Sequence, residues 1–310
     1  MSLPLGAHLT SLPTFSIVIP TYNRPARVAS CLDSLAALDY PPDRFEVIVV
    51  DDGSESPTVT NSVAARDPID VRLVRQSHAG PATARNTGAA LARGDYLAFT
   101  DDDCLPEAGW LRALAARTVN ARDHLIGGRT INALPANPYS SASQLLIDYL
   151  YEWHAAHRGA GFFASNNLAV PAERFRAHGG FHSGFPLAAG EDREFCRRWA
   201  RSGQMTYAPE AVVRHAHPLT ALSFWRQHFT YGRGAFHFYS LQARSRTERD
   251  SATPLSFYLR LVAFPLSRAG TQHRLGQAIL LCVAQAATVA GYWRERMRGG
   301  APGEARASIS

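Results

Sequence analysis

The sequence predicts an α/β protein with a mostly parallel central sheet flanked by helices. Short apolar runs rich in β-branched residues recur along its first third and alternate with stretches whose apolar residues follow helical spacing. A strand, a helix and a second strand of this kind form a βαβ unit, in which the two strands are parallel. Polar clusters follow the strands directly, and such sheets bind ligands outside the carboxyl ends of their strands.

The alternation of strands and helices runs from Phe15 to Thr100. The first helix is predicted because Val28, Cys31 and Leu35 recur at helical spacing. A later helix has proline at its first position and glycine after its end, a common arrangement. In order, we expect strand Phe15–Pro20, helix Ala26–Leu38, strand Phe45–Val50, helix Thr58–Arg66, strand Val71–Val74, helix Pro81–Ala92 and strand Tyr96–Thr100.

The second half of the chain has weaker strand signals. Phe195 and Trp199 lie one turn apart on the buried side of a predicted helix that begins at Glu191. In order, we expect a helical stretch at Leu105–Thr118 with the helix itself at Leu111–Val119, a turn-rich connection at Pro135–Ser143, a loop at Gly159–Asn167, a loop at Phe181–Ala189, the helix from Glu191 to Trp199, and an edge hairpin formed by Gly203–Pro209 and Ala211–Arg214.

Charge and composition narrow the function classes. The formal net charge is +6, and all 32 basic residues are Arg. Up to Ser240 the 22 Arg are balanced by 22 acidic residues, whereas 241–310 holds 10 Arg against 4 acids. This distribution argues against a basic nucleic-acid groove in the main domain, so no nucleic-acid partner is expected. The lack of lysine excludes Schiff-base and P-loop chemistry.

The four cysteines and the N-terminus indicate a cytoplasmic protein. Cys31, Cys104, Cys196 and Cys282 are scattered without the spacing of a metal site or a disulfide framework, as in a reducing compartment. The first residues, 1–12, lack the basic flank and the long apolar core of a signal peptide.

Three consecutive carboxylates, Asp101, Asp102 and Asp103, follow the strand at 96–100. Such a cluster repels itself unless a cation lies beside it. If the chain stays extended, Asp101 and Asp103 point the same way, and two oxygen ligands on one edge suit Mg²⁺ or Mn²⁺. The alternative is a helix N-terminus, where aspartate is favoured. One aspartate would serve for capping, so three favour the metal site.

Polar residues also end the second strand. Asp51 and Asp52 lie where a carboxylate can accept the N–H of a pyrimidine base or bond a ribose hydroxyl, and Tyr22 offers a flat face for stacking. The alternative for both aspartates is a turn, because Asp-Gly and Gly-Ser are common turn dipeptides. Arg85, near the start of its helix, could reach an acidic loop or a diphosphate. A solvated helix arginine is the alternative there.

Two clusters in the second half are candidates for chemistry. Glu191 and Asp192 start a predicted helix, where the helix dipole favours their charged forms. A base held ionised there can take a proton from a hydroxyl, although complementing the dipole is the more common role. His215 and His217 alternate along a predicted strand, so either or both could bind a metal. A surface histidine pair is the more common arrangement.

The order and spacing of these motifs are similar to those of the family 2 inverting glycosyltransferases. Each motif is weak alone, but the set is specific and extends from about Phe15 to Tyr239. It consists of Ser16–Asn23, Val49–Ser54, Ala84–Gly88, Thr100–Asp103, Gly180–Phe181, Gly190–Asp192 and His215. The resemblance implies the GT-A fold, with a Rossmann-like nucleotide-binding half and an acceptor half.

The resemblance also implies roles for single residues. Asp52 resembles the aspartate that recognises the base, Asp192 the catalytic base, and Asp103 the metal-binding end of the Asp-X-Asp pair, with Asp101 and Asp102 interchangeable at its start. The implied sites are, for the donor nucleotide, Pro20, Thr21, Tyr22, Asp52, Arg85, Asp101 and Asp102; for the metal, Asp103, Asp101 and His215; and, on the acceptor side, Glu191, Asn166, Asn167 and His217.

The implied reaction is a single displacement. A sugar passes from a nucleoside diphosphate sugar of the UDP, dTDP or GDP type to a hydroxyl of a glycan or lipid-linked acceptor, with inversion and with Mg²⁺ or Mn²⁺ assisting the departure of the diphosphate. Bacterial cell-surface glycan or glycolipid assembly is the expected setting. A catalytically inactive nucleotide-sugar-binding or scaffold subunit is the alternative. A sugar-phosphate nucleotidyltransferase or a dehydrogenase would need a glycine-rich loop after the first strand. The loop at that place, Pro20–Arg24, has no glycine.

The chain divides into an N-terminal tail at 1–13, a transferase domain at 14–240 with halves 14–103 and 104–240, and a basic, apolar helical region at 241–310. Leu275–Trp293 holds no charge, and Leu275, Ile279, Cys282, Ala286, Val289 and Trp293 fall on one helix face. This stretch is long enough to span a membrane. Its Gln, Gly and Ala content instead favours peripheral contact with the inner face of the membrane, packing on the domain, or a homodimer.

Overall fold

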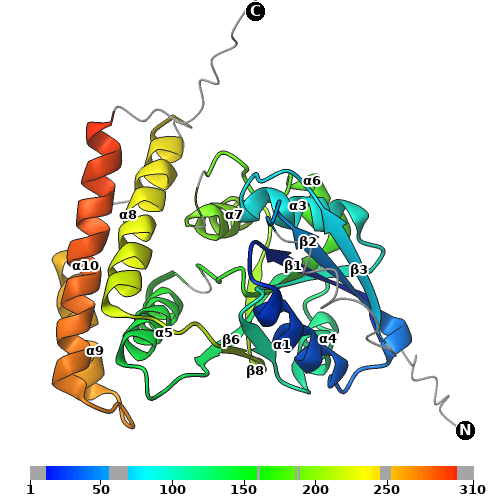
Figure 1. The fold of residues 1–310 in the computed structure, drawn as a ribbon, viewed down its shortest axis with the longest axis horizontal. Helices are drawn as coiled ribbons and strands as arrows, with labels where there is room; N and C mark the ends of the chain where they lie inside the picture. Colours follow the sequence, from blue (N-terminus) through cyan, green and yellow to red (C-terminus); the bar gives the residue numbers. More distant parts are fainter. Residues whose placement is uncertain are drawn as a thin grey trace, which may run out of the picture.

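The computed structural model describes residues 12–55, 69–158, 161–185, 187, 189–244 and 253–298. These residues form one eight-stranded sheet with the order β3-β2-β1-β4-β7-β6-β8-β5. Helices cover both faces of the sheet, and a further group of helices lies beside it (Figure 1). The predicted α/β class with C-terminal helices is confirmed.

The first half of the sheet is parallel. Its strands are β1 (Phe15–Thr21), β2 (Phe45–Asp51), β3 (Asp70–Arg75) and β4 (Tyr96–Thr100). Side chains of β1 alternate between the two faces. Ile17 and Ile19 pack with α1 (Pro25–Ala36), and Val18 packs with α3 (Pro81–Leu91). A short 3₁₀ helix, Pro42–Arg44, precedes β2. The predicted strands of this half are confirmed, and the helix predicted at Thr58–Arg66 lies outside the described residues.

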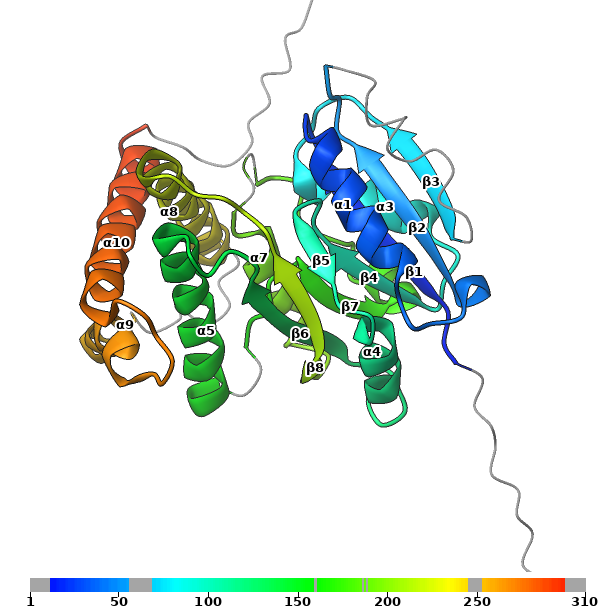
Figure 2. The same ribbon diagram turned by 60° about the horizontal axis from the view of Figure 1, so that its bottom comes forward.

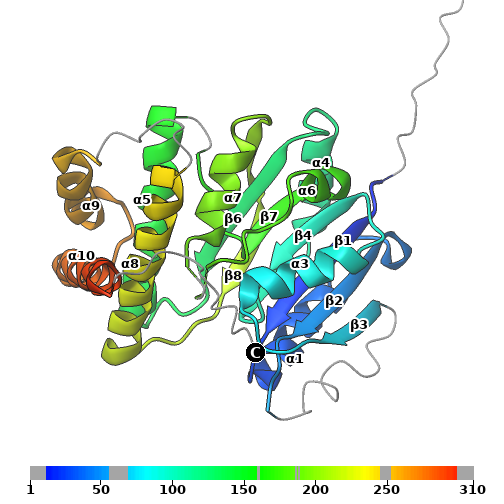
Figure 3. The ribbon, with the colours of Figure 1, turned by 90° about the horizontal axis from the view of Figure 1, so that it is seen from above.

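The second half of the sheet is mixed. Its strands are β5 (Cys104–Pro106), β6 (Leu125–Asn132), β7 (Asn167–Pro171) and β8 (Met205–His215). β7 runs antiparallel to both β4 and β6, whereas β8 runs parallel to β6 and antiparallel to β5. Figure 3 shows β7 between the parallel half and β6. The faces of this half are covered by α4 (Trp110–Thr118), α6 (Ala172–Ala177) and α7 (Glu191–Trp199).

Two predictions for this half are wrong because long-range strand pairing decides the structure. The helical stretch expected from Leu105 is wrong at its start, because Leu105 lies in β5, opposite Arg214; the helix expected at Leu111–Val119 is confirmed as α4, which begins at Trp110. The predicted edge hairpin is the single strand β8, which lies between β6 and β5. Its register against β6 shifts between Gly128 and Arg129, so that 209–211 have no partner in β6.

The remaining helices form a layer at one end of the sheet. They are α5 (Pro138–Arg158), α8 (Ala221–Arg244), α9 (Leu255–Ser267) and α10 (Arg274–Met297). Figures 1 and 2 show α9 and α10 outermost, with α5 and α8 between them and the sheet. The turn-rich connection predicted at Pro135–Ser143 is wrong from Pro138 onward, because Asn137 caps α5 by accepting the backbone N–H groups of Tyr139 and Ser140.

Candidate active site

The candidate site lies at the carboxyl ends of β1, β2 and β4, as the parallel topology predicts. Asn23 adopts the left-handed conformation, with φ of 55°, which asparagine tolerates. Its backbone N–H donates to Ser54 Oγ at 2.7 Å, and its Oδ1 accepts the N–H of Glu55 at 2.9 Å. The loops that follow β1 and β2 therefore form one connected rim.

The three aspartates after β4 point to three different partners. The N–H of Cys104 donates to the carbonyl of Asp101 at 3.1 Å, so the chain turns here and the expected alternation of an extended strand does not apply. Each carboxylate has a different nearest arginine: Asp101 Oδ1 lies 2.6 Å from Arg85 Nη2, Asp102 Oδ1 3.3 Å from Arg24 Nη1, and Asp103 Oδ2 2.8 Å from Arg27 Nη1. Arg24 Nη1 also lies 3.7 Å from Asp103 Oδ2. The sequence analysis missed Arg24 and Arg27 as counter-charges.

The pKa values of two of these aspartates move in opposite directions. Burial and the charge of Asp103 raise the pKa of Asp102 to about 6. Burial alone would raise the pKa of Asp103, but the hydrogen bond and charge of His215 and the charges of two arginines outweigh this effect and lower the pKa to about 2. Asp102 Oδ2 accepts the hydroxyl of Thr21 at 2.7 Å. Asp103 therefore stays ionised to lower pH than Asp102, and the ionised carboxylate is the state that a metal ligand needs.

Arg85 joins the aspartate loop to the start of α7. Its side chain is buried, with Nη2 2.6 Å from Asp101 Oδ1 and Nη1 3.0 Å from Glu191 Oε1. Burial of a charge is costly unless it is paired, and the two carboxylates raise the pKa of Arg85 against the effect of burial. The predicted contact with the acidic loop is confirmed, and the alternative of a solvated arginine is wrong.

Glu191 and Asp192 open α7 as predicted. Burial and the charge of Asp192 raise the pKa of Glu191 to about 7, and its Oε2 has no hydrogen-bond partner among the described residues. Asp192 is half-buried, and burial raises its pKa despite hydrogen bonds from the backbone N–H groups of Arg193 and Ser165. The two carboxyls titrate as a pair, closer to neutral pH than an ordinary carboxyl, which suits a general base.

The chemistry of the donor set fits a divalent cation at Asp103 and His215. His215 Nε2 lies 3.2 Å from Asp103 Oδ1, and these two residues and Cys104 place their ligand atoms within 4.8 Å of one another. A carboxylate and an imidazole suit Mn²⁺. Burial raises the pKa of the Cys104 thiol well above its usual range, so the sulfur stays protonated and is a poor ligand. Further ligands would come from water and phosphate oxygens.

His217 supports His215 by stacking. The two ring centroids are 3.8 Å apart with an interplanar angle of 18°. Burial and the neighbouring His215 lower the pKa of His217 to about 3, so its imidazole is neutral. Both of its ring nitrogens lack a hydrogen-bond partner within the part of the chain that the structure describes. Metal binding by His217 stays a prediction.

The nucleoside end of the site contains Asp52 and Tyr22. Asp52 is buried, and its carboxylate accepts hydrogen bonds from Gln76 Nε2 at 2.7 Å and from both backbone N–H groups of 79–80. It thereby fixes the loop after β3, and recognition of a base by Asp52 stays a prediction. Tyr22 is 40% exposed and packs on His78, with the two ring centroids 4.4 Å apart. The aromatic surface expected beside Asp52 is therefore present. Pro20 is buried within β1.

Two asparagines were predicted on the acceptor side, and the prediction for Asn167 is wrong. Its side chain is fully buried, with Oδ1 accepting Trp110 Nε1–H at 2.9 Å and Nδ2 donating to the carbonyls of Arg129 and Ala211. It joins α4, β6 and β8 and has no free group for an acceptor. Asn166 is half-buried, and its contact with an acceptor stays a prediction.

Two residues of the site were missed by the sequence analysis. Asn86 Nδ2 donates to the carbonyl of Phe181 at 2.7 Å and its Oδ1 accepts the N–H of Phe181 at 2.9 Å, which fixes the segment leading to α7. Asn86 directly follows Arg85 in the Ala84–Gly88 motif, and this position was the sequence signal that could have marked it as a site residue. Tyr231 comes from α8 and is 37% exposed; loss of hydration around its hydroxyl, together with the charges of the site carboxylates, first Asp192, raises its pKa. No local pattern marks Tyr231, because only the fold returns α8 to the site.

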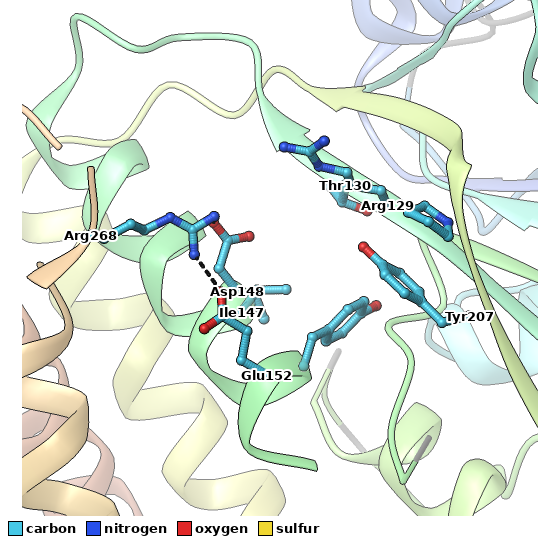
Figure 4. A pocket seen from close by; sticks show the side chains of 9 residues that line it. Arg129, Thr130, Ile147, Asp148, Glu152, Tyr207 and Arg268 are labelled. Atoms are coloured by element: carbon cyan, nitrogen blue, oxygen red, sulfur yellow. Dashed lines mark hydrogen bonds and ion pairs between the residues drawn. The ribbon is translucent and has the colours of Figure 1, made fainter. Parts of the chain in front are cut away.

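A separate cavity of about 180 Å³ lies between α5 and the strands β6 and β8 (Figure 4). Tyr151 and Tyr207 meet at one side of it with ring centroids 5.8 Å apart. At the other side Arg268 lies 2.9 Å from Asp148 Oδ2. None of the residues lining this cavity belongs to the candidate site.

The family model described as glycosyl transferase family 2 matches residues 16–178, which is more than half of the chain. The chain belongs to this family. The glycosyltransferase is 26% identical over 235 residues to glycosyltransferase AglE of Haloferax volcanii, covering 73% of this chain and 74% of that relative.

Two further relatives are longer than this glycosyltransferase. It is 30% identical over 217 residues to the pre-mycofactocin glycosyltransferase of Mycobacterium tuberculosis, covering 68% of this chain and 44% of that relative. It is also 30% identical over 238 residues to the validoxylamine A glucosyltransferase of Streptomyces hygroscopicus subsp. limoneus, covering 67% and 52%. The chain spans about half the length of these two relatives.

Solved structures confirm the predicted GT-A fold of the glycosyltransferase. A mannosyltransferase from Pyrobaculum calidifontis, in complex with GDP-Man and Mn²⁺, aligns with a TM-score of 0.59 at 20% identity, covering 90% of this chain and 76% of that one. Residues 1–349 of TarS from S. aureus align with a TM-score of 0.51 at 17% identity, covering 93% and 92%.

Proposed function

We propose that this glycosyltransferase moves a sugar from a nucleoside diphosphate sugar to an acceptor hydroxyl by a single displacement with inversion. The observation that carries the proposal is the buried bridge from Asp101 through Arg85 to Glu191. It holds the acidic loop on the donor side against the carboxylates that open α7. Direct displacement needs both sets of groups within reach of one anomeric carbon.

Asp192 is the base of this proposal. It takes the proton from the acceptor hydroxyl as that oxygen attacks the anomeric carbon from the side opposite the leaving diphosphate. Its half-exposed position and raised pKa suit this task. Glu191 is the poorer candidate, because it is buried and one of its oxygens is held by Arg85. One carboxylate suffices, since no protonated acid is needed for a diphosphate leaving group.

Asp103 and His215 are the residues that would hold the Mg²⁺ or Mn²⁺ of this proposal, with Asp101 as a further ligand if it releases Arg85. The bound cation would neutralise charge that builds up on the departing nucleoside diphosphate. Arg24 and Arg27, beside Asp103, can bond phosphate oxygens directly. The Mn²⁺ in the Pyrobaculum mannosyltransferase complex supports a metal in this fold.

The donor nucleotide and the acceptor are also part of the proposal. GDP-Man in the Pyrobaculum complex and UDP in a TarS complex support donors of these types, and dTDP stays open with them. TarS of S. aureus is named a poly(ribitol-phosphate) β-N-acetylglucosaminyltransferase. This name, with the apolar C-terminal helices, supports a glycan or lipid-linked acceptor in cell-surface glycan or glycolipid assembly on the cytoplasmic side of the membrane.

Calorimetric titration with UDP, GDP and dTDP, each with and without Mn²⁺, tests the donor site. We expect one nucleotide to bind tightly and to require the metal, and we expect His215→Ala to weaken this metal-dependent binding. Failure of all three nucleotides in both conditions would remove the donor site from the proposal. A wild-type protein that binds nucleotide but turns over no donor with any acceptor would instead support the inactive subunit.

A further inference from the structure

The outer face of α10 carries a continuous apolar stripe. The residues recur at steps of four and three and include Leu275, Ile279, Cys282, Ala286, Val289, Trp293 and Met297, all exposed. Leu275 is 70%, Ile279 57% and Val289 55% exposed. At a rise of about 1.5 Å per residue, the stripe is roughly 33 Å long. A contiguous exposed apolar surface of this extent marks a contact with another phase or another molecule.

The opposite face of α10 is fixed to α8. A Cβ atom built on Gly232 would lie 1.9 Å from the carbonyl oxygen of Thr288, and one built on Gly291 would lie 1.9 Å from that of Phe229. The two backbones therefore touch at these glycines. Glu295 is buried and forms an ion pair with Arg233 of α8. Because α10 is anchored in this way, the stripe on its other side has no partner within the described chain.

Helix α9 extends the apolar surface. Phe257, Leu261 and Phe264 pack on Tyr149 and its neighbours in α5. The opposite side of α9 exposes Leu255 at 72%, Leu259 at 64% and Leu266 at 47%. Figures 1 and 3 both show α9 beside α10 in the outermost layer, away from the sheet. Exposed apolar side chains of both helices therefore belong to this outermost layer.

The exposed charges on the described residues of α8, α9 and α10 are positive. Segments 221–244 and 255–298 contain a single acidic residue, Glu295, and it is buried in its ion pair. Exposed arginines lie along α9 and at both ends of α10, namely Arg260, Arg274, Arg294, Arg296 and Arg298. A second copy docked through the described residues of these helices would bring the same positive rim, and no exposed acid of those helices would pair with it. Anionic phosphate groups complement both the arginines and the apolar stripe.

We propose that α9 and α10 bind the surface of a membrane that contains anionic phospholipids, with both helices lying in the interface plane. The stripe residues enter the boundary between head groups and acyl chains, and the arginines contact lipid phosphates. By length and composition α10 could cross a bilayer. Its backbone contacts with α8 oppose this, since crossing would carry Arg233 and Glu295 into hydrocarbon. The inference is independent of the transfer chemistry.

Co-sedimentation of the full chain with vesicles tests the proposal. We expect binding to mixed phosphatidylcholine and phosphatidylglycerol vesicles at low salt, and little binding to phosphatidylcholine alone. Ile279→Ser/Val289→Ser should weaken binding about tenfold or more. Arg294→Gln/Arg296→Gln should weaken it about fivefold per charge, on anionic vesicles only. Leu91→Ser/Val119→Ser is the matched control, because both are exposed apolar residues of the sheet-covering layers.

Several results would overturn the proposal. One is a wild-type protein that binds neither vesicle, and another is equal binding by the stripe variant and its control. A dimer in solution that Ile279→Ser/Val289→Ser converts to a monomer, without vesicle binding, would assign the face to a second copy. Retention in the vesicles after an alkaline wash would show a crossing helix. Unchanged thermal unfolding and nucleotide binding of each variant show that it is folded.

Discussion

Arg85→Met tests whether the bridge between the aspartate loop and α7 holds the site together. The change leaves Glu191 buried without the guanidinium that lies 3.0 Å from its Oε1, and Asp101 without its partner at 2.6 Å. Removing one member of a buried pair costs about 3–5 kcal/mol. At roughly 2–4 °C per kcal/mol, the range for domains of about 150–250 residues, the melting temperature should fall by roughly 6–20 °C.

Arg112→Met is the matched control. Arg112 binds Asp39 through two hydrogen bonds of 2.7 and 3.0 Å, but the side chains are 49% and 65% exposed. Exposed pairs of this kind contribute little, so its melting temperature should match the wild type. The double variant Arg85→Met/Glu191→Gln should recover about 1–3 kcal/mol of the loss, because it removes the buried carboxylate that lacks a partner.

Thermal and urea unfolding at neutral pH, followed by circular dichroism, measures all three variants. A melting temperature for Arg85→Met equal to that of Arg112→Met would refute the argument, since Arg85 would then behave as a solvated arginine. A double variant no more stable than Arg85→Met would trace the cost to lost packing instead of an unpaired Glu191.

Three further outcomes follow from the site. Asp192→Asn should keep wild-type nucleotide affinity and lower turnover by about 10²-fold or more; an unchanged rate would remove Asp192 as the base. The fold raises the pKa of Glu191 from 4.5 to about 7. Between these two pH values the folded protein binds a proton that the unfolded chain has lost, so the free energy of unfolding should fall as pH rises. Denaturation of Glu191→Gln at several pH values should show a flatter slope. His215→Ala should weaken Mn²⁺ binding by calorimetry with nucleotide present, and equal affinity would count against His215 as a ligand.

The parallel half of the fold was predictable because its strands need no distant partner to be recognised. The runs at 15–20 and 45–50 are apolar except at Ser16 and Glu46, as expected of strands buried on both faces, and they are rich in β-branched residues. β6 carries two adjacent glycines and β7 is short, so neither has a strong local signal. Both exist through antiparallel pairing with each other and with β4, which a single-sequence pattern does not encode.

The candidate site was predictable in its acidic residues and unpredictable in their partners. The strand ends located Asp52 and the aspartate loop, and the helix pattern located Asp192. The direction of each side chain depends on the turn at 101–104 and on arginines that approach from α1 and α3. Asn167 shows the same limit, because the family resemblance placed it on the acceptor side while the fold uses it to join three elements.

A run of three aspartates does not offer three metal ligands. Asp101 is held by Arg85, and Asp102 is buried against Thr21 with a raised pKa. Asp103 alone combines a lowered pKa with a neighbouring imidazole, and it can exchange Arg27 for a stronger cation without breaking the bridge to α7. The arginines thus neutralise the charges of the aspartate loop before any cation or diphosphate binds. Binding of a cation at Asp103 therefore requires the exchange of one contact in a site that is already formed.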